Sequence, residues 1–184
     1  MVSGMLSKRG VAICDSDILA HEAIKKGTEG YKAIVREFGT VVLGADSEID
    51  RRTLGDVVFG DKEKLKLLNS IIHPVVYAGW TRWLDNRRNE GCLAAVMVPL
   101  LFEAGFDNGW DAIICVASRR DVQVGRLMGR GFSEKESLTR INSQMSIDEK
   151  CVRSDYVFIN NFDLRLLGLQ VTRTMNILLG EKIC

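Results

Sequence analysis

The chain has 184 residues, of which 46% are hydrophobic and 27% are charged, and this composition predicts one globular domain with a full core. Its 25 Lys and Arg residues nearly balance its 24 Asp and Glu residues, so the net charge of +1 gives no general attraction to nucleic acid or to a membrane. No apolar run reaches the ~18 residues of a membrane span. The five cysteines form no CxxC pair and three lie in or beside apolar runs, which indicates buried reduced thiols and a cytoplasmic protein.

The chain opens with a short helical pattern over residues 2–8 and then alternates apolar strands with helical segments. Strands are expected at 11–14, 92–98, 112–117 and 156–159. These runs are apolar throughout, as in a sheet that helices cover on both faces, so the predicted class is α/β with a mainly parallel sheet. Further helices are expected at 18–26, 29–38, 50–58, 61–71, 74–89, 120–129 and 133–145.

Two insertions interrupt the expected alternation of strands and helices. The stretch between the first two strands is far longer than one crossover helix requires, which predicts a helical subdomain over residues 18–91. Within it, His73-Pro74 favours a new helix, because proline is common at the first helical position. A second insertion over residues 119–150 is rich in arginine. Both belong to a single domain over residues 1–184.

Polar side chains follow the strands at the edge where parallel sheets bind ligands. Asp15 and Asp17 come after the first strand, Glu103 after the second and Asn160 after the fourth. Asp17 could accept a proton from an attacking hydroxyl or hold the water shell of Mg²⁺. Alternatively, Asp17 is the N-cap of the helix that follows. Acids, arginines and amides at one edge together suggest a cleft that handles phosphate.

The second insertion carries arginines at helical spacing. Arg126 and Arg130 are four residues apart with Gln123 beside them, and Arg140 and Gln144 repeat this spacing on the next helix. Guanidinium groups match phosphate oxygens and stabilise negative charge in a transition state, so such a set could clamp a phosphate. A solvated basic face is the alternative interpretation.

Three other residues have plainer explanations when each is considered alone. Pro99 ends the second strand, and Glu103 favours the start of a helix. His73 is better explained as a structural residue before its proline than as a catalytic base. The chain also contains no Gly-Lys pair, and hence no GxxxxGK[ST] loop to cradle the phosphates of a nucleotide.

Taken together, these segments resemble the dephospho-CoA kinase family of the P-loop kinase superfamily, over essentially the whole chain. The resemblance is carried by CDSDILAHEAI, DRRTLGDVVF, LLNSIIHPVV, VMVPLLFEAG, the Gln123/Arg126/Arg130 set, RINSQM and SDYVFINN, in family order. It implies a five-stranded parallel sheet, with residues 18–91 as the substrate-binding subdomain and 119–150 as a lid. The implied reaction is phosphoryl transfer from ATP to the ribose 3′-hydroxyl of dephospho-CoA, the last step of coenzyme A synthesis.

The same resemblance assigns roles to residues. Asp17 matches the catalytic acid and an indirect ligand of Mg²⁺, and Arg126 matches a catalytic arginine. Arg130 and Asn160 are expected to contact ATP. The residues expected to bind dephospho-CoA are Asp15, His73, Pro99, Leu100, Leu101 and Glu103.

In this family a strand and a glycine-rich loop precede a helix like the one at residues 2–8. We therefore expect that about 15 residues are missing before Met1, the sum of a short strand and the loop. Without them, phosphoryl transfer should fall towards background and the sheet should be split or soft. Two alternatives are an inactive relative that acts as a binding or regulatory module, and another P-loop kinase that acts on a nucleotide-like hydroxyl.

Overall fold

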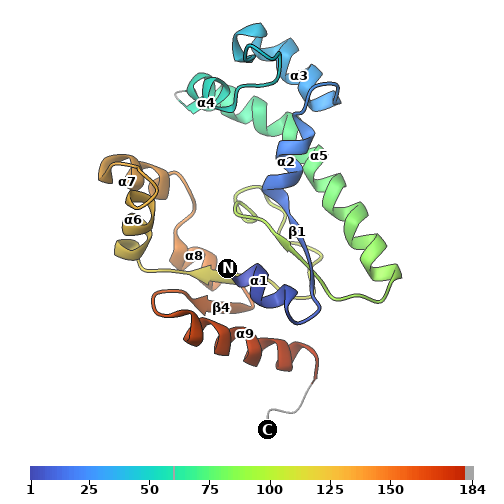
Figure 1. Cartoon of the computed structure of the whole chain (residues 1–184), viewed down its shortest axis with the longest axis vertical. Helices are drawn as coiled ribbons and strands as arrows, with labels where there is room; N and C mark the ends of the chain where they lie inside the picture. Colours follow the sequence, from blue (N-terminus) through green and yellow to red (C-terminus); the bar gives the residue numbers. More distant parts are fainter. Residues whose placement is uncertain (60, 181–184) are drawn as a thin grey trace. The chain divides into compact units, whose positions relative to one another are not determined.

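The computed structural model describes residues 1–59 and 61–180, which fold as two compact units. One unit is Gly10–Pro99, and the other combines Met1–Arg9 with the chain from Leu100 onward (Figure 1). The helical subdomain expected over residues 18–91 lies wholly within the first unit. The lid expected over residues 119–150 lies wholly within the second.

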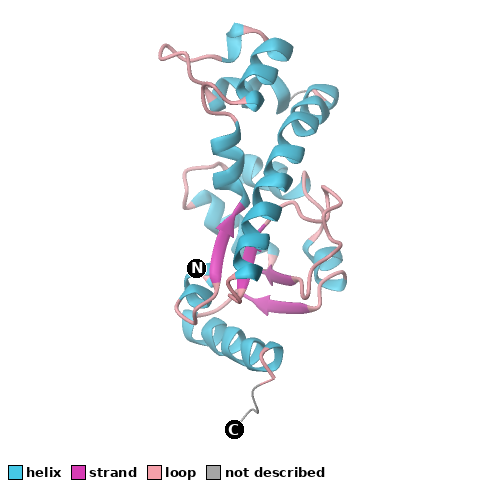
Figure 2. Cartoon of the chain, turned by 90° about the vertical axis from the view of Figure 1, so that its right-hand side faces the viewer, coloured by secondary structure: helices cyan, strands magenta, loops and turns pink. Residues whose placement is uncertain are grey.

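The Gly10–Pro99 unit joins a pair of parallel strands to a group of helices. Its elements are β1 (Ala12–Asp15), α2 (Ser16–Ala23), α3 (Glu29–Phe38), the 3-10 turn η1 (Thr40–Val42), α4 (Arg51–Phe59), α5 (Lys62–Asn89) and β2 (Ala94–Met97). Strands β1 and β2 pair in parallel, with Ala12 opposite Ala94 and Asp15 opposite Met97. Helix α2 packs along α5, and Gly79 of α5 leaves room there for the Leu19 side chain (Figures 1 and 2).

The helices of this unit have an apolar core of their own. It is formed by Ile24, Ile34, Val42, Ile49, Leu54, Val58 and Leu68. Ile34 and Val42 are completely buried, because one face of α3 and the turn after it are covered by α4 and α5. Gly30 permits the close approach of α3 to α2, since a Cβ at this position would lie 2.2 Å from the carbonyl oxygen of Ala23.

Helix α5 corrects the expectation of two helices separated at His73-Pro74. It runs unbroken from Lys62 to Asn89 with Pro74 inside it. Proline removes one backbone hydrogen bond and favours a break when only the local sequence counts. Here Leu68, before the proline, and Val76 and Trp80, after it, are all buried. Packing on both sides of the proline therefore outweighs the local preference.

The second unit carries the other parallel strand pair. Its elements are α1 (Val2–Ser7), β3 (Ile114–Ala117), α6 (Arg120–Met128), α7 (Glu134–Asn142), α8 (Ile147–Val152), β4 (Tyr156–Ile159) and α9 (Leu164–Leu178). Strands β3 and β4 pair from Ile114 opposite Tyr156 to Ala117 opposite Ile159.

Helix α9 holds this second unit together. Its Leu167 and Val171 are buried with Phe158 of β4. Helix α1 lies beside α9 (Figure 1), with Leu6 buried and Arg9 donating a hydrogen bond to the Thr172 hydroxyl. The N-terminal helix expected from the sequence is therefore present and packed.

The mixed α/β class with parallel strands is confirmed, and all four expected strands are present. Strand β4 has the expected bounds, β1 is shifted by one residue, and β2 and β3 are shorter than expected. Among the described residues they form two separate two-stranded sheets, β1-β2 and β3-β4. No helix in the described part of the chain is long and apolar enough to cross a membrane.

The cysteines agree in part with the expectation of buried thiols. Cys14 and Cys115 are buried within β1 and β3, whereas Cys151 is only partly buried. The expectation is wrong for Cys92, which is exposed because β2 begins two residues after it. Cys184 lies outside the described residues.

Candidate functional site

The first group of candidate residues lies where β1 passes directly into α2. The Asp15 carboxylate accepts a hydrogen bond from the backbone N–H of Asp17 at 2.9 Å and is the N-cap of α2. Asp17 is therefore not the cap, as one interpretation of the sequence expected, because the helix begins at Ser16. Its side chain stands in the first helical turn, is exposed and is not needed for capping.

The surroundings of Asp17 favour its protonated form. Partial burial of the carboxyl, together with the negative charge of Asp15, raises the pKa of Asp17, while Arg51 acts in the opposite direction. A guanidinium nitrogen of Arg51 lies 3.4 Å from the Nδ1 atom of His21, and His21 belongs to the same helix, α2, as Asp17. A carboxyl with a raised pKa at the end of a strand is the kind of group that accepts a proton during catalysis.

His73 lies within α5 and its side chain is partly buried. Burial lowers the pKa of its imidazole. The residue is therefore neutral at neutral pH and does not add a positive charge to this unit.

The segment after β2 is a series of turns. The backbone N–H of Ala104 donates to the Leu100 carbonyl at 3.0 Å, and that of Phe106 donates to the Leu101 carbonyl at 3.0 Å. The alternative that Glu103 starts a helix is therefore wrong. The boundary between the two units falls between Pro99 and Leu100, and Leu100 is exposed.

In the second unit, the ends of β3 and β4 are joined by Arg126. Its guanidinium donates to Ser118 Oγ at 2.8 Å, to the backbone oxygen of Asn160 at 2.7 Å and to Asn160 Oδ1 at 3.2 Å. Gln123, one turn earlier on α6, donates to the Ser118 backbone oxygen at 2.6 Å. The structure therefore brings Gln123 and Arg126, which the sequence placed in one set, together with Asn160 from a separate motif.

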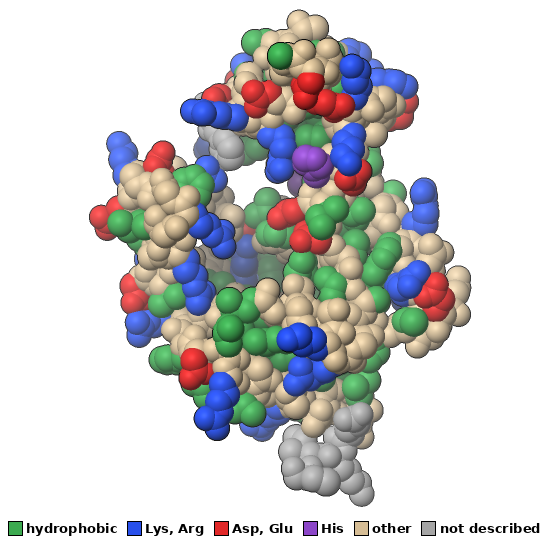
Figure 3. Space-filling model, in the orientation of Figure 1, with side chains coloured by type: hydrophobic (Ala, Val, Ile, Leu, Met, Phe, Trp, Pro, Cys, Tyr) green, Lys and Arg blue, Asp and Glu red, His purple; other side chains and the backbone are tan. Residues whose placement is uncertain are grey.

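The predicted arginines surround one cavity of about 680 Å³, which we call the arginine pocket. Its lining includes Arg120, Gln123, Arg126, Arg130, Arg140, Gln144 and Lys150. Lys and Arg side chains are visible on the part of the surface that α6 and α7 form (Figure 3). Five cationic side chains and one carboxylate, that of Asp148, line the pocket, so it is suited to a multiply charged anion.

Two residues of the predicted arginine pattern, Arg130 and Gln144, reach this pocket from turns and not from helices. Helix α6 ends at Met128 and α7 ends at Asn142, so Arg130 and Gln144 lie beyond the helices and do not share a helical face with Arg126 and Arg140. Gly131, with a positive φ of 93°, turns the chain just after Arg130. The turns after the helices still direct these residues to the pocket.

Two residues of the pocket were given no specific role from the sequence. Arg120 donates to Asn142 Oδ1 at 2.6 Å and so ties α6 to the end of α7. Lys150 belongs to α8, outside any motif that the spacing could identify. The Arg140 guanidinium stacks on the Phe132 ring, 4.3 Å from the ring centroid. This contact could have been predicted from the sequence, because Phe132 lies just before α7.

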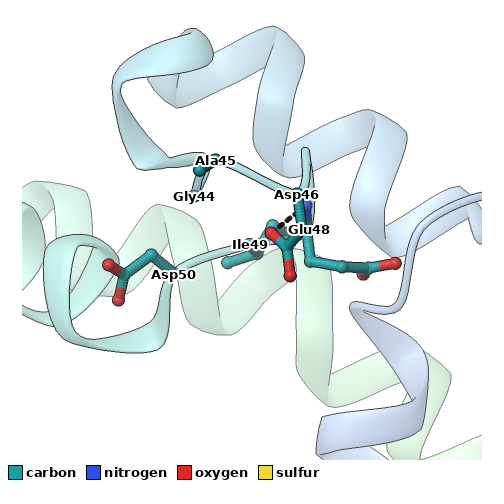
Figure 4. A pocket seen from close by; sticks show the side chains of 6 residues that line it. All are labelled: Gly44, Ala45, Asp46, Glu48, Ile49 and Asp50. Carbon is teal, nitrogen blue, oxygen red and sulfur yellow. Dashed lines mark hydrogen bonds between the residues drawn. The ribbon is translucent and has the colours of Figure 1, made fainter.

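A second hollow, of about 440 Å³, lies in the Gly10–Pro99 unit and is lined by residues 44–46 and 48–50. The Asp46 carboxylate accepts the backbone N–H of Glu48, whereas the carboxylates of Glu48 and Asp50 point in opposite directions (Figure 4). Within the described residues, no three His, Cys, Asp or Glu side chains are grouped as a metal site would require.

Known proteins resemble this chain over most of its length. The sequence profile of dephospho-CoA kinase matches residues 1–165. The chain is 41% identical to the dephospho-CoA kinase of Lactobacillus johnsonii over 155 residues, which are 83% of this chain and 78% of that protein. It is 43% identical to the dephospho-CoA kinase of Bacillus cereus over 162 residues, or 87% and 80% of the two chains.

Solved structures show the same fold. A crystal structure of a Thermus thermophilus protein superposes with a TM-score of 0.80 at 32% identity, covering 100% of this chain and 91% of that one. The dephospho-CoA kinase of Campylobacter jejuni gives a TM-score of 0.72 at 24% identity, covering 98% and 92%. The profile match and the curated relatives each span most of the chain, and on these grounds the chain belongs to the dephospho-CoA kinase family.

Proposed function

We propose that this protein transfers the γ-phosphoryl group of ATP to the ribose 3′-hydroxyl of dephospho-CoA, the final step of coenzyme A synthesis. The observation that carries the proposal is the arginine pocket, a concentration of positive charge in a chain that belongs to the dephospho-CoA kinase family. Transfer of a phosphoryl group depends mainly on positioning and on neutralising negative charge, and the pocket supplies both.

On the nucleotide side, Arg126 is proposed to stabilise the transferring phosphoryl group, and Arg130 and Asn160 to contact ATP. The hydrogen bonds to Ser118 and Asn160 fix the Arg126 guanidinium in place before any ligand arrives. A preorganised cation loses little free energy to reorganisation when charge develops in the transition state.

On the acceptor side, Asp17 is proposed to orient the attacking hydroxyl and accept its proton. The Asp17 residue is exposed overall and is not used as a helix cap, while partial desolvation of its carboxyl and the charge of Asp15 raise its pKa. One carboxylate also suits Mg²⁺, which binds few protein ligands and takes the rest from water and substrate phosphates, so Asp17 would hold this ion through water and the ion would neutralise phosphate charge.

Other residues are proposed to bind dephospho-CoA. They are Asp15, His73, Pro99, Leu100, Leu101 and Glu103. Leu100 is exposed on a turn, and Asp15 stands beside Asp17. These features support contacts with the acceptor, which is a nucleotide carrying a long, partly apolar arm.

The 184 residues contain no GxxxxGK[ST] loop, so we expect this chain by itself to turn over slowly. A second candidate function is that the protein binds dephospho-CoA without phosphorylating it and acts as a binding or regulatory module. The two functions share a ligand but differ in whether coenzyme A is formed.

The test is an assay with ATP, Mg²⁺ and dephospho-CoA, with coenzyme A identified by mass spectrometry. It should use the 184-residue chain and also the product of the longest in-frame reading frame that contains it. Formation of coenzyme A in either form supports the kinase. Calorimetric binding of dephospho-CoA without turnover would support the binding module, whereas turnover of nucleoside monophosphates instead would contradict the choice of acceptor.

A further inference from the structure

Among the described residues, Glu103 and Lys150 form the most buried ion pair. The Lys150 ammonium lies 2.8 Å from Glu103 Oε1, and only 12% of the Lys150 side chain and 22% of the Glu103 side chain are exposed. The two residues come from the turn segment after β2 and from α8, both in the second unit. Two charges removed from water in this way must hold each other closely, because an unpaired buried charge is costly.

Glu103 also contacts Met145, five residues before Lys150 in the chain. Its Oε1 atom accepts a hydrogen bond from the backbone N–H of Met145 at 3.0 Å. Burial alone would raise the pKa of Glu103, but the hydrogen bonds from Lys150, its own backbone N–H and Met145, together with the Lys150 charge, hold this pKa below its ordinary value. The group is therefore a carboxylate at neutral pH, and it holds both ends of the segment 145–150.

This segment is one wall of the arginine pocket. Met145, Ser146, Ile147, Asp148 and Lys150 all line the cavity that is also lined by Arg126 of α6, Arg130 in the turn after α6 and Arg140 of α7. Glu103 does not line that cavity, so it reaches the pocket only through the residues it holds. Glu103 therefore contacts residues that line the cavity but not the cavity itself.

We infer that Glu103 is a positioning residue for the nucleotide. Through Lys150 and the Met145 N–H it sets the wall of the arginine pocket on which the phosphate groups of ATP are held. The inference rests on the proposed function, since it takes the pocket to be the ATP side of the site. For Glu103 it is an alternative to the direct contact with dephospho-CoA proposed above, and the kinetic experiment below distinguishes the two.

Removing this carboxylate should not unfold α8, because another anchor holds its far end. Arg153 donates to Asp107 Oδ2 at 2.6 Å, and its guanidinium lies 4.6 Å from the centroid of the Phe102 ring. Neither Asp107 nor Arg153 lines the arginine pocket. Arg153 also contacts Met145 Sδ at 3.9 Å, but Asp107→Asn leaves both the Glu103–Lys150 pair and the bond from the Met145 N–H in place. Asp107→Asn is therefore the control, since it removes an ion pair from the same region without changing the contacts of Glu103.

The kinetic experiment is a double-mutant cycle of Glu103→Gln and Lys150→Met, measured in the form of the protein that turns over. Glu103→Gln keeps an acceptor for the Met145 N–H and loses only the charge. It should raise KM for ATP about tenfold, within the range for coupled neighbours, and leave KM for dephospho-CoA unchanged. If Glu103 acts through Lys150, Glu103→Gln should change nothing further in the Lys150→Met background. Lys150→Arg, which can still pair, should restore most of the ATP affinity.

Three results would overturn the inference. They are an increase in KM for dephospho-CoA alone, effects of the two substitutions that simply add, and the same change in KM for ATP from Asp107→Asn. A wild-type protein that forms no coenzyme A would instead contradict the proposed function.

A readout that needs no turnover separates these failures. Hydrogen exchange at the Met145 amide should accelerate in Glu103→Ala and stay at the wild-type rate in Asp107→Asn. Calorimetry should show weaker ATP binding by Glu103→Gln than by wild type. Unchanged exchange at Met145 would show that the carboxylate does not hold the wall, whatever the activity.

Discussion

The Arg126 guanidinium lies 2.7 Å from the backbone oxygen of Asn160, and this contact ties α6 to the residue that follows β4. The same guanidinium donates to Ser118 at the end of β3, so one side chain joins the ends of two paired strands. Arg126 therefore links two strand ends and is also proposed to stabilise the transferring phosphoryl group, and kinetics of a variant can separate these two roles.

Arg126→Ala should lower kcat far more than it raises KM for either substrate. Loss of a preorganised cation typically costs about 10²–10³ in kcat, because its interaction strengthens only in the transition state. Steady-state kinetics with both substrates, in the form that turns over, measure this split. Arg165→Ala, an exposed arginine of α9, is the control and should leave both constants unchanged. Equal losses in kcat and in affinity would mean that Arg126 contributes only to binding.

Asp17→Asn should lower turnover by about 10²–10⁴, the usual contribution of a general base. It should also make the protein slightly more stable at neutral pH. The folded protein raises the pKa of Asp17 above the ordinary 3.8, so ionising this group in the folded state costs stability as the pH rises through the raised value. Asparagine avoids that cost and still donates the backbone hydrogen bond from residue 17 to the Asp15 carboxylate.

Thermal unfolding of the wild type and of Asp17→Asn at several pH values checks the second part. The advantage of the variant should shrink as the pH falls towards 3.8, where the wild-type carboxyl is protonated as well. A variant that is less stable than wild type at pH 7 would show that the Asp17 carboxylate is a stabilising group and not one held ready for proton transfer.

The strands and most helices could be predicted because their signals are local. Continuous apolar runs predict β1 to β4, and the spacing of apolar residues in α3 predicts the face that buries Ile34. The failure at Pro74 has the opposite cause. The penalty for proline inside a helix is local, whereas the packing of Trp80 and Val76 that outweighs it depends on the rest of the unit.

The candidate site could be predicted in kind but not in detail. The arginine spacing pointed to a phosphate clamp, but Arg130 reaches the pocket from a turn and not from a helical face. Lys150 was given no specific role because its partner, Glu103, is distant along the chain and neither residue stands in a repeating pattern. Contacts of this kind follow from the tertiary fold, which spacing within one helix does not report.

The thiols should react with an alkylating agent in an order set by burial and ionisation. Among the four cysteines that the structure describes, Cys92 is exposed and should be modified first. Burial and the neighbouring Cys151 thiol, 3.9 Å away, raise the pKa of Cys115 to about 12, so only roughly one Cys115 thiol in 10⁴ is ionised at pH 8. Because the thiolate is the reactive form, Cys115 should be among the slowest sites.

Peptide mapping after timed exposure to iodoacetamide gives the rate at each cysteine, and the same experiment in denaturant is the control. The rates of Cys92 and Cys115 should become similar once the chain is unfolded. Rapid labelling of Cys115 in the folded protein would mean that β3 is open to solvent.

The partly buried His73 should make the protein less stable in mild acid. Burial lowers the pKa of its imidazole below the ordinary 6.5, so between the folded and unfolded pKa values the unfolded chain binds more protons. The stabilising contribution is fully present above pH 6.5 and is lost as the pH falls through the lowered folded value. Denaturant unfolding at pH 8 and pH 5 should therefore show a smaller fall in unfolding free energy for His73→Gln than for wild type. The same measurement on His21→Gln, at an exposed position of α2, corrects for the other histidine of the chain. Equal falls in wild type and His73→Gln would mean that His73 remains protonated inside the folded unit, and that some anionic partner and not burial controls its charge.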